Sequence, residues 1–84
     1  MRRKIIGRYI VIDSNICHGK PTFRGTRIMV SQVLEMVAEG RDWESIDAAW
    51  DGKVSKEAIA EAVSLAKQAF LEHTEDFVVE IVSA

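Results

Sequence analysis

The chain has 84 residues, enough for one small domain whose own core will be marginal, because little of the surface is buried on folding at this size. Apolar residues make up 48% and charged residues 29%, which is typical of a folded domain and excludes a disordered chain. The single cysteine excludes an internal disulfide, and no apolar run approaches the roughly 18 residues of a membrane span. No cleavage pattern follows the charged N-terminus, so we expect a soluble cytoplasmic protein.

The charges are divided unevenly along the chain. Residues 1–27 carry seven basic side chains against Asp13 alone, a net charge of +6, whereas residues 28–84 carry four basic against twelve acidic ones, a net charge of −8. Such an asymmetry indicates one face for an anionic partner and another for a cationic or apolar one. The alternative is two solvated faces that attract each other within the fold.

The first expected element is a strand over residues 8–12, where β-branched and aromatic side chains lead up to the turn residues that begin at Asp13. A single helical turn is expected near Ile16. A second short strand, or an extended lead into a helix, is expected over residues 27–30. A small hairpin or bridge between the two strands would close the base of the loop that separates them.

That loop, residues 17–27, combines backbone-shaping residues with positive charge. Glycines allow positive φ, proline fixes its own backbone, and threonine can bond local backbone groups. The shaping residues are Gly19, Pro21, Gly25 and Thr26. The three cations Lys20, Arg24 and Arg27 make the loop either a phosphate clamp or a structural clasp in which they bond carbonyls and carboxylates of the fold, and the sequence leaves both alternatives open.

Three helices are expected after the loop. The first begins near Ser31, its expected cap, and stops at Gly40, the second is capped by Asp42, and the third is capped by Ser55 and extends to about His73. The predicted fold class is mainly α with short β: a tri-helical helix-turn-helix, homeodomain-like bundle, preceded by a short strand or hairpin and followed by a C-terminal strand or tail. The second and third helices would form the helix-turn-helix pair.

The helices also suggest where partners bind. Because glutamates outnumber lysines on the third helix, its charge favours core or dimer packing over base reading. Large aromatic side chains are assigned to the core or to a dimer seam: Trp43, Trp50 and Phe70. For DNA, we expect contacts from the loop cations, the N-terminal arginines and a lysine at the start of the third helix: Lys20, Arg24, Arg27, Arg2, Arg3 and Lys56.

Beyond residue 74 the pattern changes to an alternating strand whose two faces are both largely apolar. We therefore divide the chain into a domain at residues 1–74 and a partner-binding segment at residues 75–84. The strand must find a sheet, either at residues 8–12 of its own or a sister chain, or in a different protein. The partner-binding residues are predicted to be Phe77, Val79 and Ile81, together with Glu75 and Asp76.

The sequence predicts no catalytic site. Cys17 and His18 are adjacent, no acid is spaced to orient a base, and the distance to His73 fits no zinc spacing. The glycines of the loop match no nucleotide-binding fingerprint. We therefore expect no metal, no cofactor and no small-molecule substrate.

One part of the chain has a familiar pattern. The run from Asp13 to Val30, which contains GKP at residues 19–21 and RGTR at residues 24–27, is followed by VLEMVAEG at residues 33–40. Over about residues 8–70 the chain strongly resembles a family of small bacterial and archaeal proteins, the domain of unknown function numbered four-three-three. Members look like compact helix-turn-helix domains, and many are regarded as antitoxins of type II toxin–antitoxin pairs, similar in role to VapB proteins.

The resemblance implies a partner and a role. The partner would be a PIN-like ribonuclease toxin, a fold with an acidic metal site inside a positively edged RNA groove, to which the tail could add a strand and carboxylates. A homodimer would also bind operator DNA and repress its own operon. The alternative is a stand-alone DNA-binding transcriptional regulator without a toxin, and a small enzyme is a distant third. The motif assigns none of its residues a catalytic task.

Overall fold

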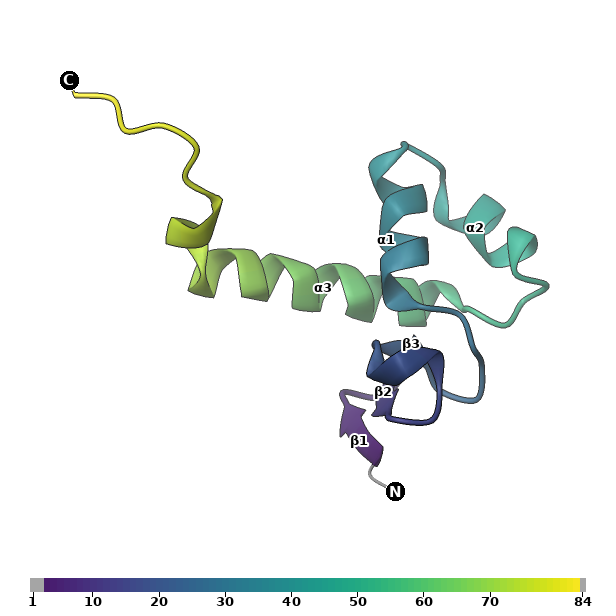
Figure 1. Ribbon diagram of the computed structural model, residues 1–84. Coiled ribbons are helices and arrows are strands. Elements are labelled where there is room, and N and C mark those ends of the chain that lie inside the picture. The colour runs from purple at the N-terminus through teal and green to yellow at the C-terminus, as the bar shows by residue number, and fades with distance from the viewer. Residues whose placement is uncertain (1–2, 84) are drawn as a thin grey trace.

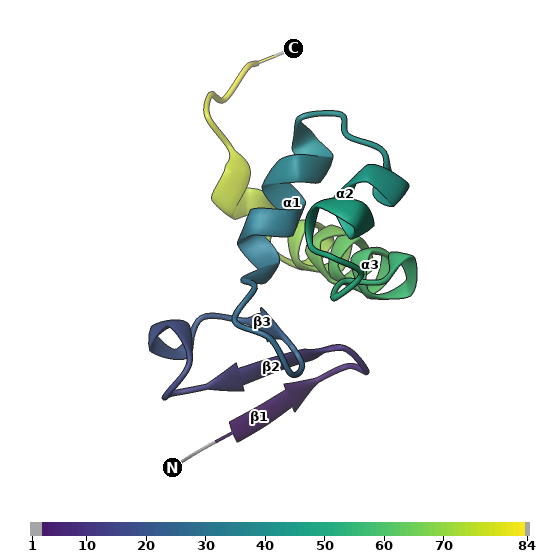
Figure 2. The same ribbon diagram turned by 90° about the vertical axis from the view of Figure 1, so that its right-hand side faces the viewer.

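The computed structural model describes residues 3–83 and has three helices on one side of a small antiparallel sheet (Figures 1 and 2). The sheet has the order β1-β2-β3, formed by β1 (Arg3–Ile6), β2 (Ile10–Asp13) and β3 (Thr22–Phe23). The first two strands form a hairpin in which Ile6 faces Ile10. The central strand is thus hydrogen-bonded on both sides.

The hairpin was not predicted in full. The expected strand over residues 8–12 begins two residues later, at Ile10, and a separate strand precedes it. The cause is Gly7, whose φ of +64° lies in the left-handed region that favours glycine and reverses the chain. The pattern of apolar residues in the sequence does not indicate that reversal.

The partner of the first predicted strand also differs. Residues 27–30 contribute only an isolated bridge, between Met29 and Thr22, whereas β3 lies inside the loop itself. The expected hairpin or bridge between residues 8–12 and 27–30 is therefore wrong, because Met29 pairs with β3 and not with β2. Thr22 and Phe23 are both buried, so their pairing with β2 is supported by packing as well as by hydrogen bonds.

The first helix, α1, spans Val30–Ala38 and starts one residue earlier than predicted. The expected cap, Ser31, lies inside the first turn. The position before the helix belongs to Met29, whose backbone N–H donates to Oε1 of Gln32 at 2.9 Å. The glutamine therefore reaches back to satisfy a backbone donor that a capping serine would have left to solvent.

The other two helix starts are confirmed. Asp42 precedes α2 (Trp43–Ala49), and Ser55 precedes α3 (Lys56–Glu72). Each side chain accepts a hydrogen bond from the backbone N–H three residues further on, at 2.8 Å and 3.1 Å. The predicted fold class is likewise confirmed: three helices with short β structure before them and an irregular tail after them.

The core lies between the sheet and the three helices and uses only the first half of α3. Its side chains are Ile10, Phe23, Ile28, Val30, Val33, Ile46, Val54, Ala58, Ile59 and Ala62. Burial of each large aliphatic or aromatic side chain contributes about 1.5–3 kcal/mol relative to exposure. No helix in the described part of the chain is both long and apolar enough to cross a membrane.

The second half of α3 leaves this core and projects away from the rest of the domain (Figure 1). Every residue from 66 to 72 is exposed. One turn of 3-10 helix, η2 (Thr74–Phe77), follows, and residues 78–83 have no regular structure. The predicted strand is therefore absent in the free chain, and its pairing with residues 8–12 of the same chain is wrong because β2 already has two neighbours.

Candidate functional site

The first half of the loop folds into one turn of 3-10 helix, η1 (Cys17–Gly19). All three of its residues have positive φ, from +51° to +78°, and Gly19 has the largest value. Lys20 returns to extended backbone, as expected of the residue before a proline. The C=O of Pro21 accepts the N–H of Val30 at 3.0 Å, which fixes the loop to the start of α1.

The second half of the loop is a turn held by one threonine. The hydroxyl of Thr26 donates to the C=O of Phe23 and accepts the N–H of Ile28, both at 2.9 Å. Gly25 in this turn has a φ of +78°. The N–H of Arg24 donates to the C=O of Tyr9 at 2.7 Å, so the turn is also bonded to the β1–β2 hairpin. Backbone groups and a hydroxyl therefore hold the loop closed.

The loop cations take no part in that closure. The side chains of Lys20, Arg24 and Arg27 are exposed, and none has a hydrogen bond or ion pair with any residue from 3 to 83. Within residues 3–83, the three cations therefore make none of the carbonyl or carboxylate bonds that the structural-clasp alternative requires. Lys56, also predicted to contact DNA, lies 3.5 Å from the Glu44 carboxylate, but both side chains are exposed and such a pair is weak.

A glutamate of α3 holds the hairpin turn in place. The two oxygens of Glu61 accept the backbone N–H groups of Arg8 and Tyr9, each at 2.8 Å. A Cβ added to Gly7 would lie 2.7 Å from this carboxylate, so a larger residue would displace Glu61, and the φ of +64° also favours glycine there. No sequence signal distinguishes Glu61 from the other glutamates of α3, because its partners are backbone groups more than fifty residues away.

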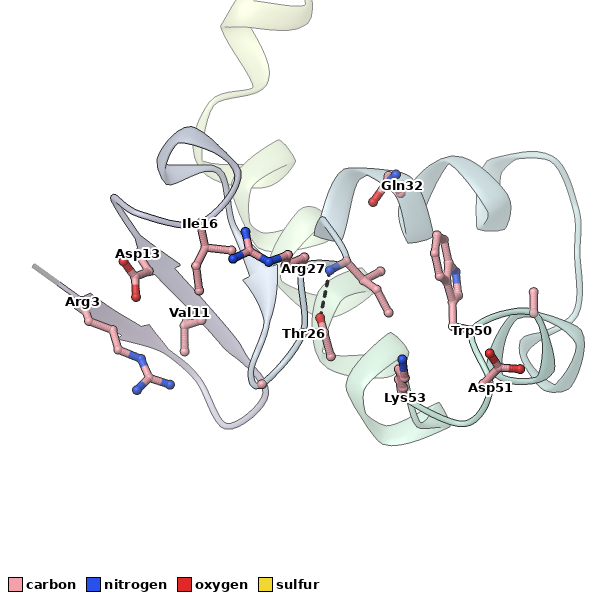
Figure 3. Close-up of a pocket in the computed structure, with 13 residues that line it drawn as sticks. Arg3, Val11, Asp13, Ile16, Thr26, Arg27, Gln32, Trp50, Asp51 and Lys53 are labelled. Carbon is pink, nitrogen blue, oxygen red and sulfur yellow. Dashed lines mark hydrogen bonds between the residues drawn. The ribbon is translucent and has the colours of Figure 1, made fainter.

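A groove of about 1130 Å³ runs between the sheet and the turn after α2. Figure 3 shows Arg3 and Arg27 on its sheet side, across from Trp50, Asp51 and Lys53. The structure thus brings two of the predicted DNA-binding arginines together. Arg2 lies outside the described residues, and Lys53 was not predicted because nothing in its sequence neighbourhood marks it.

The cysteine and histidines do not form one site. The Cys17 thiol donates to the C=O of Arg27 at 3.4 Å, within the loop. His73 lies at the far end of α3, 3.8 Å from the exposed carboxylate of Asp76. Within residues 3–83, no three side chains of His, Cys, Asp or Glu are grouped so as to hold a metal ion.

The aromatic residues divide between two environments. Trp43 and Trp50 are half-buried against the core, and the indole N–H of Trp50 points to the Met36 sulfur at 3.2 Å. Phe70 is instead exposed on the projecting half of α3, where its ring lies 5.1 Å from that of Phe77. Among these aromatic residues, the pair at the end of α3 is the more exposed and can contact a second molecule without opening the core.

The tail beyond this pair is apolar and uncovered. Phe77 is 58% exposed, Val79 98% and Ile81 89%, and the acidic side chains of Glu75 and Asp76 are also exposed. The predicted partner-binding residues therefore form one continuous segment at the end of the molecule farthest from the sheet (Figure 1). In water this segment leaves unburied a large apolar surface that is characteristic of interaction sites.

These features define a small tri-helical domain with a basic hairpin and loop at one end and an apolar tail at the other. The model of a family described as "Protein of unknown function (DUF433)" matches residues 10–66, about two thirds of the chain, and the protein belongs to that family. The match ends within α3, so the projecting half of that helix and the tail lie outside it. No curated protein and no solved structure shows a match.

Proposed function

We propose that this protein is the antitoxin of a toxin–antitoxin pair, which binds and neutralises a PIN-like ribonuclease through its C-terminal segment. The observation that carries the proposal is the uncovered tail, in which Val79 and Ile81 are almost fully exposed. A small domain with a marginal core gains buried area by docking such a segment on another protein. The alternating pattern of residues 77–82 suits addition to the edge of a partner sheet.

The charge of the segment fits the same partner. Glu75 and Asp76 directly precede the apolar residues and are exposed. If the tail lies along the toxin's sheet, these carboxylates come close to the basic edge of an RNA groove, where they compete with the phosphates of a substrate. The apolar residues then supply affinity, and the two acids direct the segment to the groove.

The test co-expresses this chain with the product of the adjacent gene, which the proposal expects to be a PIN-like ribonuclease, and asks whether the tail is required. A chain that ends after His73 should fold, since residues 74–83 bury nothing in the core, but should fail to co-purify with the nuclease and to restore growth. Undiminished neutralisation by the shortened chain would contradict the proposal. Circular dichroism of both chains, with equal melting midpoints, is the control for folding.

Two further variants test whether the segment binds as a strand. Residues 79 and 81 lie on one face of a strand, and residues 78 and 82 lie on the other. One double variant replaces Val79 and Ile81 by aspartate, and the other replaces Val78 and Val82 by aspartate. The affinities of the two variants for the nuclease should therefore differ by at least about tenfold. Equal losses would mean that the segment binds, but not as an added strand.

A second candidate function, a DNA-binding regulator that acts with or without a toxin, is favoured by the unpaired cations of the loop. An antitoxin that represses its own operon would combine both roles. A shift assay with its promoter DNA, with and without the nuclease, separates them. Promoter binding in the absence of any neutralising activity would favour the regulator alone.

A further inference from the structure

Three turns that are distant in the sequence meet beside the start of α3. They are the hairpin turn at residues 7–9, the loop turn at residues 24–26 and the connection at residues 50–55. The N–H of Arg24 bonds the C=O of Tyr9 at 2.7 Å, and Glu61 of α3 holds the hairpin turn through two N–H groups. These bonds therefore fix the backbone of the hairpin turn relative to the loop turn and to α3.

A hollow of about 410 Å³ lies between the three turns. Its charged lining residues are Arg8, Arg24 and Lys53, and no carboxylate lines it. All three cations are exposed, and none forms an ion pair within residues 3–83. Glu61, beside the hairpin turn, uses both of its oxygens to accept backbone N–H groups.

The larger groove on the other side of the loop turn differs in charge. It is lined by the cations Arg3, Arg27 and Lys53, but also by the carboxylates of Asp13 and Asp51. An anion in that groove would meet a net charge of about +1, against +3 in the smaller hollow. Arg24 and Arg27, which the sequence placed together in one clamp, therefore face different electrostatic environments.

We propose that the hollow lined by Arg8, Arg24 and Lys53 binds phosphates of a duplex DNA backbone and so places the first turn of α3 against the DNA. This inference rests on the DNA-binding part of the proposed function and adds the site and two residues, Arg8 and Lys53, to it. A free phosphate ion would need donors enclosed in a pocket. Exposed cations on a surface suit a charged polymer, in which several weak contacts add up.

The position of α3 agrees with that partner. Ser55 and Ala58, which belong to the cap and first turn of the helix, also line the hollow. In a helix-turn-helix pair the N-terminal residues of the second helix approach the bases, while neighbouring groups contact phosphates. The first turn of α3 carries Lys56 and one acid, Glu57, so its own side-chain charges cancel, and the other acids of the helix, Glu61 and Glu72, lie further from its N-terminus.

The experiment compares two triple variants with the same change in net charge. One replaces Arg8, Arg24 and Lys53 by glutamine, and the control replaces Lys4, Arg41 and Lys67, which are exposed, line neither hollow and were not assigned to DNA contact. Binding to a duplex from the protein's own promoter, and to a random duplex of the same length, is measured by fluorescence anisotropy at several salt concentrations. Thermal melting of each variant checks that it folds.

If each cation contacts one phosphate, the slope of log affinity against log salt falls by about 0.9 per contact, or about 2.7 for the triple variant. A doubling of salt would then weaken the wild type about sixfold more than it weakens this variant. The loss should be the same on both duplexes, because phosphate contacts carry no sequence information. The control should keep a slope close to that of the wild type.

Equal slopes for the two triple variants would overturn the proposed site while leaving DNA binding itself established. A wild type that binds neither duplex but still neutralises the nuclease would overturn this inference and leave the protein-binding role standing. If the Arg8, Arg24 and Lys53 variant no longer binds the nuclease but still binds DNA, the hollow belongs to a protein interface and the inference is also wrong. Within the site, Arg24→Gln should reduce the slope more than Arg27→Gln does.

Discussion

At the scale of single residues, Glu61 shows how a surface glutamate can determine the position of a distant turn. Helical periodicity places Glu61 on the polar side of α3. The structure agrees with that placement, since the residue is only partly buried. Its role depends on the bonds to the N–H groups of Arg8 and Tyr9, which the pattern of the helix does not contain. Charged acceptors of this kind form stronger bonds than neutral ones.

Glu61→Gln should lower the free energy of unfolding by about 1–3 kcal/mol, because an amide offers one acceptor where the carboxylate offers two and leaves a backbone donor unpaired. Chemical denaturation of the variant measures this loss. Glu35→Gln, on an exposed position of α1, is the matched control and should change the stability by less than 0.5 kcal/mol, roughly the effect of an ordinary surface substitution. Equal effects of the two changes would contradict the assigned role.

Asp42, the cap of α2, makes the stability depend on pH. Hydrogen bonds from the backbone N–H and then the side chain of Ser45 lower the pKa of Asp42 below its ordinary value. Because the folded pKa is lower than the unfolded one, the stabilisation is present at pH values above the unfolded pKa and is lost as the pH falls through the folded pKa. Asp42→Asn keeps an acceptor but does not titrate.

The asparagine variant should therefore lose less stability than the wild type between pH 7 and pH 3, as measured by urea denaturation at both values. Asp42→Ala should show the same shallower dependence on pH but lower stability at pH 7, because it lacks the cap altogether. A wild-type pH dependence in either variant would show that Asp42 is not the titrating group. Together the two variants separate the effect of the Asp42 charge on stability from the effect of its hydrogen bond.

At the scale of secondary structure elements, the sequence predicted those helix ends that are determined by interactions between residues close together in the chain. The caps Asp42 and Ser55 gave correct starts for α2 and α3, because a cap bonds a backbone group three residues away. The start of α1 was misplaced because Gln32, not Ser31, satisfies the first donor. The strands were the least predictable elements, since their partners lie in other segments.

The two halves of α3 should differ in their contribution to stability. Ala60 and Ala69 are both exposed, but only the first lies in the half that packs on the core. Glycine costs about 1 kcal/mol relative to alanine inside a stable helix. We expect Ala60→Gly to lower the free energy of unfolding by about that amount and Ala69→Gly by less than half as much, because the projecting half can fray without unfolding the core.

Chemical denaturation of the two variants tests the difference, and hydrogen exchange gives an independent measure of it. Amides near residue 69 should exchange faster than those near residue 60. Equal losses of stability would show that α3 unfolds as one unit. The helix would then be a rigid arm, and its exposed face would need no partner to become ordered.

At the scale of the whole molecule, the uneven charge of the sequence becomes a separation in space. The hairpin and loop, residues 3–27, hold six basic side chains and one acid, whereas the helices and tail are acidic. Both ion pairs among the described residues lie within the acidic part, so the two parts do not neutralise each other. This arrangement favours the expectation of separate faces for separate partners over the alternative of internal attraction.

The candidate site was accessible from the sequence only in part. The loop residues with unusual backbone demands could be recognised, because glycine, proline and threonine have local conformational effects. The neighbours of Arg24 could not be recognised, since Arg8 and Lys53 come near it only through the packing of three turns. The tail was identified correctly as a largely apolar segment, but it does not form the predicted strand, and the alternative in which it pairs with residues 8–12 of the same chain was wrong.

The bond between Glu61 and the hairpin turn also sets an order of events during synthesis. Its two ends are separated by 53 residues, so the N-terminal hairpin leaves the ribosome long before the carboxylate that secures it. A two-stranded hairpin alone is at best marginally stable in water. The basic end of the protein therefore acquires its final shape only after α3 has been made, and folding waits for nearly the whole chain.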